Sequence, residues 1–184
     1  MKRIPTAAVV RWSASLLAYG GPGLLLFAMA WDPRWLGQLG SVAIMAVATF
    51  GLRAITVPLG KFSYGSPAGV VAVSGGLLVG SVPTALAMAV GAAAGDWMIQ
   101  RKGGWAVLVN AGREVISLFV AYGLYAAVLQ LVGVVSPLSS EGFIAIVVFV
   151  TGYLFVSRSL FYFTLLIRQK LGAGEQRIIV RYEF

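Results

Sequence analysis

Five ionisable side chains fall within or at the ends of long apolar stretches of the sequence. They are Arg53, Asp96, Arg113, Glu114 and Arg158. A charge at the centre of a membrane helix costs about 2.5–3.5 kcal/mol on insertion scales, so such groups usually face the interior of a helix bundle and pair there. Three positive and two negative groups therefore predict one buried polar network.

Four polar residues on one helix face extend this set. They are Asn110, Arg113, Glu114 and Ser117, at positions i, i+3, i+4 and i+7. Residues at this spacing lie on one side of a helix, and we expect that side to point inward. The candidate network then consists of Arg53, Asp96, Asn110, Arg113, Glu114 and Arg158.

A simpler interpretation stays open for the outer members of the set. Arg53 and Arg158 can extend to lipid headgroups, as long basic side chains do near the ends of membrane helices. Asp96 then pairs with Lys102 or Arg101, its neighbours in sequence. The two interpretations differ in whether ion pairs join separate helices.

The composition excludes most enzyme chemistry. The 184 residues contain no Cys and no His. This rules out disulfides, thiolate nucleophiles, His-ligated metals and Ser-His mechanisms. We therefore expect a protein that is not an enzyme, without catalytic or metal-ligating residues, and the sequence points to no particular cofactor.

Hydrophobic residues make up 59% of the chain and charged residues 11%. Soluble domains contain about 45–50% and about 25% of these classes. The mean hydropathy is +0.89, too high for a soluble domain of this size. In a membrane protein, the net charge of +8 indicates contact with anionic lipid on the cytoplasmic side rather than with nucleic acid.

Apolar runs predict an all-α integral membrane protein with a bundle of six transmembrane helices over residues 12–167. A bilayer core of about 30 Å requires about 20 helical residues. The third and fourth runs are divided at Gly80-Ser81-Val82-Pro83, because Gly and Pro end helices. The six spans are expected at about 12–30, 39–59, 68–80, 82–99, 105–132 and 143–167.

The distribution of basic residues predicts the orientation. With residues 1–11 and the tail 168–184 in the cytoplasm, ten of the 14 Lys and Arg residues lie on that side and only Arg34 lies outside. Such a bias is typical of cytoplasmic loops. We expect a multi-pass protein of a bacterial inner membrane with both termini in the cytoplasm.

Small residues spaced by four recur in three of the expected helices. Such pairs let helix backbones approach closely in a membrane. The predicted packing pairs are Ala14 with Ala18, Gly76 with Gly80, and Gly91 with Gly95.

Several short motifs carry a resemblance to a known group. They are Val57-Pro58-Leu59-Gly60, Gly80-Ser81-Val82-Pro83, Gly95-Asp96 and Asn110-Ala111-Gly112. Over about residues 50–170 the chain resembles the N-terminal membrane module of bacterial HD-domain and GGDEF-domain signalling proteins. The resemblance implies a sensory or docking module, followed in that group by a soluble catalytic domain. If the chain is complete without such a domain, we expect it to act through partner proteins in the membrane.

The chain is more distantly similar to the substrate-binding S components of energy-coupling-factor transporters. Those proteins have six helices and an Ala-x-x-x-Ala pair on the first, as at Ala14 and Ala18. This resemblance implies an outward-facing solute pocket and a membrane partner. The short, nearly uncharged outer loops, about 31–38 and 133–142, argue against a charged vitamin. A structural accessory subunit of a larger complex is the third hypothesis.

Overall fold

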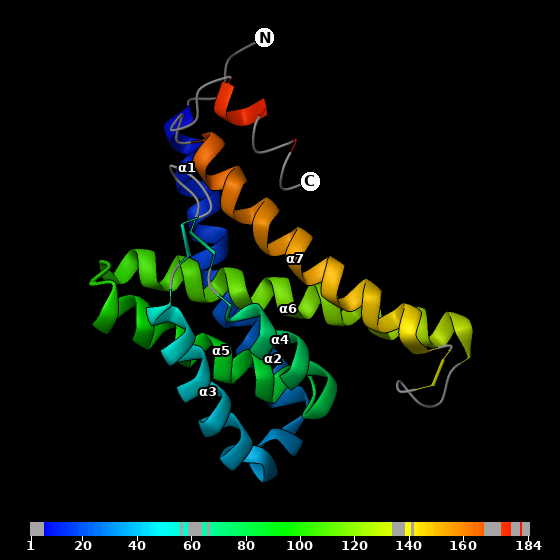
Figure 1. Ribbon diagram of the computed structural model, residues 1–184. Coiled ribbons are helices and arrows are strands. Elements are labelled where there is room, and N and C mark those ends of the chain that lie inside the picture. The colour runs from blue at the N-terminus through cyan, green and yellow to red at the C-terminus, as the bar shows by residue number, and fades with distance from the viewer. Residues whose placement is uncertain are drawn as a thin grey trace.

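The computed structural model describes most of the chain as helix, with one short β-ladder (Figure 1). The described residues are 6–55, 57–58, 64–65, 67–133, 139–140, 142–167, 174–177 and 181. The prediction of an all-helical membrane-type protein is therefore confirmed at the level of fold class. Most of the predicted basic tail, 168–184, lies outside the described residues.

The first described segment is one long, continuous helix. Helix α1, Thr6–Ser15, passes through a π-helical turn, η1, Leu16–Gly20, into α2, Gly21–Trp31. A π turn holds one more residue than an α-helical turn. Pro22 lies just after this π turn, and a proline inside a helix removes one N–H from the backbone hydrogen bonds, which accounts for a local irregularity at this point.

A tight connection at Asp32 reverses the chain. The Asp32 carboxylate accepts a hydrogen bond from the backbone N–H of Arg34. It also forms an ion pair with the Arg34 guanidinium, with 2.7 Å between Oδ1 and Nε. The 3-10 turn η2, Pro33–Gln38, leads into α3, Leu39–Ala54.

Helix α3 ends earlier than the sequence predicts. The expected span 39–59 is wrong beyond Ala54, because β1, Val57–Pro58, pairs antiparallel with β2, Tyr64–Gly65. The residue before a proline is driven toward extended conformations, which fits a strand at Val57.

The predicted division near Pro83 is confirmed. Helix α4, Gly69–Leu78, is separated from α5, Ser81–Ala94, by Gly80 with a φ of 104°. This conformation favours glycine, so the break is built into the sequence. Helix α5 continues into a second π turn, η3, Gly95–Ile99.

Among the residues that the structure describes, five helices are long and apolar enough to cross a membrane. They are Ala8–Trp31, Pro33–Ala54, Ser81–Ile99, Gly104–Val132 and Gly142–Phe163. Helix α4 is apolar but has only 10 residues, which rise about 15 Å. The expected third span, 68–80, is thus a short apolar helix, and five to six helices are apolar enough to span a membrane.

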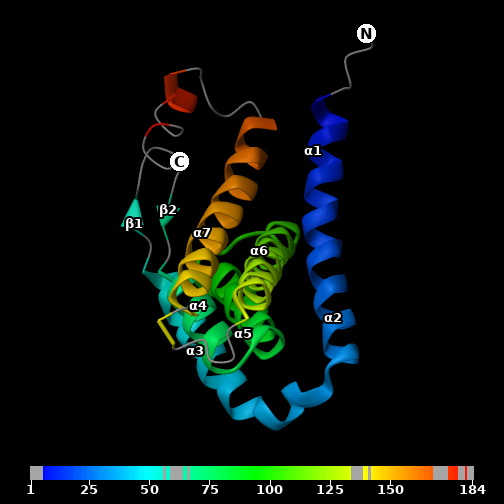
Figure 2. The same ribbon diagram turned by 90° about the vertical axis from the view of Figure 1, so that its right-hand side faces the viewer.

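Helix α6, Gly104–Val132, is the central element and is followed by α7, Gly142–Ile167. Figure 2 shows α6 nearly end-on, with the α1–α2 column on one side and α7 on the other. Helix α6 packs against α7, α5, α2 and η1. The main apolar core lies along it and includes Ala72, Ala85, Met88, Leu118 and Phe149.

The start of α1 and the end of α7 lie at the same end of the molecule in both views (Figures 1 and 2). The junction between α2 and α3 lies at the opposite end.

Candidate functional site

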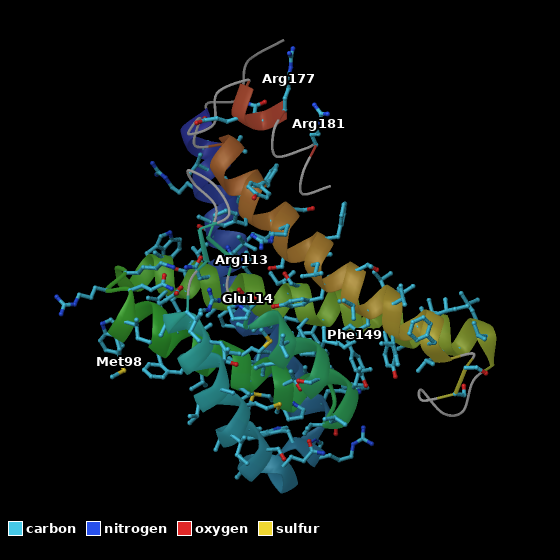
Figure 3. The ribbon with its side chains drawn as sticks, viewed as in Figure 1. Met98, Arg113, Glu114, Phe149, Arg177 and Arg181 are labelled. Atoms are coloured by element: carbon cyan, nitrogen blue, oxygen red, sulfur yellow. The ribbon has the colours of Figure 1, made fainter. Side chains whose placement is uncertain are left out.

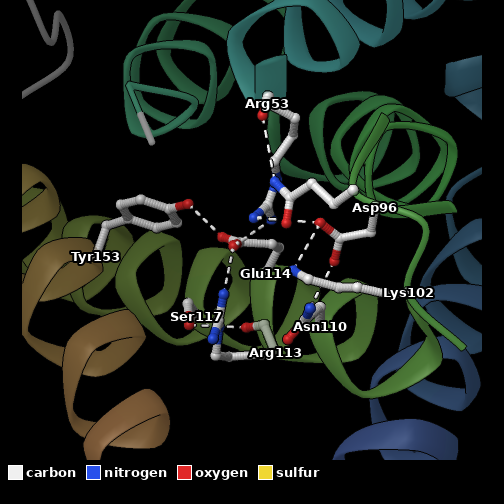
Figure 4. A network of polar contacts seen from close by, with 9 residues as sticks. Arg53, Asp96, Lys102, Asn110, Arg113, Glu114, Ser117 and Tyr153 are labelled. Atoms are coloured by element: carbon white, nitrogen blue, oxygen red, sulfur yellow. Dashed lines mark hydrogen bonds and ion pairs between the residues drawn. The ribbon is translucent and has the colours of Figure 1, made fainter. Parts of the chain in front are cut away.

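The buried side chains of Arg53 and Glu114 form the centre of a polar network (Figure 4). Arg53, in the last turn of α3, donates from Nη2 to Glu114 Oε1 of α6 over 2.7 Å. Each side chain is only 7% exposed. An ion pair this buried is costly to form, and breaking it leaves an uncompensated charge.

Asp96 is fully buried at the second residue of the π turn η3. Its Oδ1 lies 3.1 Å from Lys102 Nζ and 4.0 Å from Arg53 Nη1. Its Oδ2 accepts a hydrogen bond from Asn110 Nδ2. Asp96 therefore joins α3, the connection after η3, and the first half of α6.

The connection between η3 and α6 is shaped to bring Lys102 back to Asp96. The backbone N–H of Lys102 donates to the Asp96 carbonyl over 2.9 Å, and Arg101 adopts a positive φ of 51°. Burial lowers the pKa of Lys102 below that of an ordinary lysine, and the facing carboxylate of Asp96 opposes this effect. Gln100 adds a hydrogen bond of 3.2 Å to the Arg53 carbonyl.

Tyr153 brings α7 into the network. Its hydroxyl donates to Glu114 Oε2 over 2.7 Å, and the residue is 3% exposed. A Cβ at Gly69 would lie 3.2 Å from the Tyr153 ring, so the start of α4 also packs here. Sequence reasoning missed Tyr153. Two signals were available in the sequence. Tyr153 lies four residues after Phe149, which places both on one helix face. A buried tyrosine hydroxyl also needs a hydrogen-bond partner.

Arg113 approaches Glu114 from the other side. Its Nη2 lies 3.1 Å from Glu114 Oε1, and its guanidinium lies over the Phe161 ring, 5.3 Å from the centroid. Ser117 is buried, but its hydroxyl donates to the Arg113 carbonyl of its own helix over 2.8 Å. The Ser117 hydroxyl therefore has its hydrogen-bond acceptor within α6 and takes no part in the ion pairing.

The predicted member Arg158 lies half-buried on α7. It follows Tyr153 by five residues, which turns it about 140° around the helix axis. Arg53, Asp96, Asn110, Arg113 and Glu114 do come together, and the pairing of Asp96 with Lys102 from the simpler interpretation is present beside them.

The glycine pair on α5 and η3 lies against α3. A Cβ at Gly91 would overlap the Ala46 carbonyl and lie 2.7 Å from Thr49 Cβ. A Cβ at Gly95 would lie 2.7 Å from Arg53 Cβ. Gly95 thus allows Arg53 and the neighbouring Asp96 to approach.

The other predicted small residues differ in their surroundings. Gly76 faces the Phe149 ring, with 2.6 Å between a built Cβ and Phe149 Cζ. Ala14 and Ala18 are buried in a cluster with Leu17 and Val109. Gly80 has nothing within 4 Å of a built Cβ, so its predicted packing role is wrong, and it serves the turn before α5 instead.

The tightest helix crossing involves two glycines that sequence reasoning did not select. A Cβ at Gly21 would overlap the Gly112 backbone, and a Cβ at Gly112 would overlap the Leu17 carbonyl. The π turn η1 therefore rests on α6 immediately before Arg113 and Glu114.

Within the part of the chain that the structure describes, no group of three or more acidic side chains could hold a metal ion. The arrangement is a network of buried ion pairs in which Arg53 and Arg113 share one oxygen of Glu114. No protein-family model, curated protein or solved structure matches this chain.

Proposed function

We propose that the chain is a non-catalytic, multi-pass membrane module that acts through a partner protein, as a sensory or docking unit. The observation that carries the proposal is the network around Glu114, which joins α3, η3, α6 and α7 through buried charges. Buried ion pairs contribute little net stability compared with apolar packing, but they impose one specific arrangement of helices. A module that transmits a helix position to a partner requires such a defined arrangement.

Helix α7 is the element best suited to pass on a change. It contacts the ion pairs at two places: the hydroxyl of Tyr153 donates to Glu114, and the Phe161 ring lies against the guanidinium of Arg113. A shift or rotation of α7 breaks this hydrogen bond without dismantling the pair between Arg53 and Glu114. The proposed signal is therefore the loss or recovery of this hydrogen bond, while the pair between Arg53 and Glu114 holds the other helices in place.

The proposed orientation has both termini in the cytoplasm of a bacterial cell, with the protein in the inner membrane. The excess of basic residues in the proposed inner segments supports this orientation. The common location of the start of α1 and the end of α7 is consistent with it. The basic inner face would meet anionic lipid.

The solute-binding and accessory-subunit hypotheses rank lower. The resemblance to S components includes the Ala pair of the first helix, and Ala14 and Ala18 are 4% and 2% exposed here because they pack inside the chain with Leu17 and Val109. A structural subunit needs only apolar packing, for which buried Arg53 and Glu114 offer no advantage.

Purification of the tagged full-length chain from native membranes in mild detergent tests the function. We expect one membrane or membrane-associated partner, with a diguanylate cyclase or phosphohydrolase domain, at a constant ratio. Recovery of an ATPase pair with a T-type membrane protein would instead assign the transporter role. Incorporation into a fixed multi-subunit complex would assign the accessory role.

Reporter fusions test the orientation separately. We expect fusions at Arg101 and after Phe184 to report the cytoplasmic side, and a fusion at Gly37 to report the outer side. If Arg101 and the C-terminus reported opposite sides, the proposed orientation would be wrong.

A further inference from the structure

Among the residues that the structure describes, the side chains paired with Glu114 and Asp96 carry one more positive charge than these two carboxylates carry negative charge. Three cations face these two carboxylates: Arg53, Lys102 and Arg113. Lys102 pairs with Asp96, with 3.1 Å between the charged atoms, and Arg53 pairs with Glu114, with 2.7 Å. Each of these pairs has no net charge, so the positive charge of Arg113 is the surplus.

The geometry of Arg113 agrees with this count. Its Nη2 reaches Glu114 Oε1 at 3.1 Å, but Arg53 Nη2 already occupies that oxygen at the shorter distance of 2.7 Å. The other oxygen of Glu114 accepts from Tyr153. The Phe161 ring beneath the guanidinium offers a cation–π contact but no hydrogen-bond acceptor.

Two guanidinium N–H groups of the network also lack acceptors. Among the described residues, Arg53 Nε and Arg113 Nε are buried without a hydrogen-bond partner. Buried polar groups are nearly always satisfied, and an exception is a place to expect a bound water or ion. A water molecule would accept hydrogen bonds from the donors but would leave the positive charge of Arg113 uncompensated. An anion accepts the hydrogen bonds and also neutralises this charge.

We propose that the network binds a phosphate-type oxyanion, with Arg113 as its principal ligand. The planar fork of a guanidinium matches two oxygens of a phosphate group. Arg113 lies on α6 beside Glu114 (Figure 3), next to the crossing with η1 at Gly112. The anion accepts hydrogen bonds from Nε and Nη2 of Arg113 and takes the place of the shared contact to Glu114. This proposal stands on charge and geometry and does not depend on the partner-dependent function.

Thermal unfolding of the delipidated full-length chain in neutral detergent tests the proposal. The probes are phosphatidylglycerol against phosphatidylcholine, and inorganic phosphate against chloride at equal ionic strength. We expect the melting temperature to rise by roughly 3–5 °C at ten times the dissociation constant. A rise with phosphate alone assigns a soluble anion, and a rise only with phosphatidylglycerol assigns a lipid headgroup.

Variants separate this site from general charge effects. Arg113→Gln leaves Arg53 and Lys102 against Glu114 and Asp96, a balanced set, so we expect it to fold and to lose the anion-dependent shift. Arg113→Lys keeps the charge but loses the fork, and we expect less than half of the shift. Arg34→Gln alters an arginine whose side chain is 86% exposed, and we expect the full shift.

Three results would overturn the proposal. The first is the absence of any shift in the wild type with every phosphate-bearing probe. The second is an undiminished shift in Arg113→Gln. The third is loss of the helical circular dichroism signal in Arg113→Gln without anion, because a residue needed for folding is not a surplus charge.

Discussion

One face of α6 is held by ion pairs at one end and by apolar packing at the other. Glu114 is followed at helical spacing by Leu118, Ala121 and Tyr125, all at most 5% exposed. On α7 the same change occurs between Tyr153, which binds Glu114, and Phe149, which is fully buried in the apolar core. Within one helical turn the interface passes from charges to hydrocarbon.

The apolar end is assembled from aromatic rings and glycines. Phe149 packs with Tyr122 and Tyr125 at centroid distances of 5.8 and 5.5 Å, and its ring edge fits against Gly76. Such contacts add many small attractions and tolerate modest repacking. In a membrane they provide the close approach that replaces the hydrophobic effect.

The ionic end behaves differently because its members depend on one another. The single carboxylate of Glu114 accepts hydrogen bonds from Arg53, Arg113 and Tyr153. Removing one apolar group leaves the remaining contacts in place, whereas removing a shared carboxylate leaves several buried donors unsatisfied at once. The comparison therefore predicts unequal effects of substitutions of similar size at the two ends.

Replacing the shared carboxylate should give the largest effect. We expect Glu114→Leu to reduce the free energy of unfolding by about 3–5 kcal/mol, because two buried arginines lose their counter-charge. Denaturation in mixed micelles, followed by circular dichroism, measures this. Asp32→Asn serves as the control, since Asp32 pairs with Arg34 at an exposed turn. Equal stability of Glu114→Leu and wild type would contradict the network as a structural unit.

Removing the contact from α7 should have the next largest effect. We expect Tyr153→Phe to cost about 1.5–3 kcal/mol, the range for hydrogen bonds to charged groups, because Glu114 Oε2 loses its donor. The ring remains, so packing against Gly69 is preserved. Hydrogen exchange should increase in α7 and not in α3. Uniform exchange across both helices would show that Tyr153 does not couple α7 specifically.

Much of this arrangement could be predicted from the sequence, and there are physical reasons why the rest could not. Apolar run length and Gly80 place the helices, and the spacing from Asn110 to Glu114 places the inward face of α6. The π turns were not predicted, because one extra residue within an apolar run leaves no compositional mark. The η3 turn changes the direction of Asp96, and η1 brings Gly21 onto Gly112.

The partner of Glu114 on α7 also depended on packing rather than on composition. Arg158 was the charged candidate on that helix, yet the rotation of α7 presents Tyr153. The rotation is set by Phe149 fitting against Gly76, a contact between segments far apart in sequence. Charge complementarity alone could not show that Tyr153, and not Arg158, is the residue of α7 that donates to Glu114.

Glycine contacts provide a test at intermediate size. We expect Gly91→Ala to destabilise by about 1–3 kcal/mol, because the new Cβ overlaps the Ala46 carbonyl and forces α3 outward. Gly51→Ala is the matched control on α3, with nothing within 4 Å of its built Cβ. There we expect a gain of about 0.5–1 kcal/mol from helix propensity. The same sign for both variants would mean that propensity, not close approach, governs these positions.

The smallest effect is expected at the exposed turn between α2 and η2. The hydrogen bond from the Arg34 side chain lowers the pKa of Asp32 below its usual value. A carboxyl with a lowered pKa in the folded state contributes stability above its unfolded pKa of about 3.9, and this contribution disappears as pH falls through the folded pKa. The melting temperature of wild type should therefore decline slightly more than that of Asp32→Asn between pH 5 and pH 3, as scanning calorimetry can measure. An equal or larger decline in Asp32→Asn would contradict this origin.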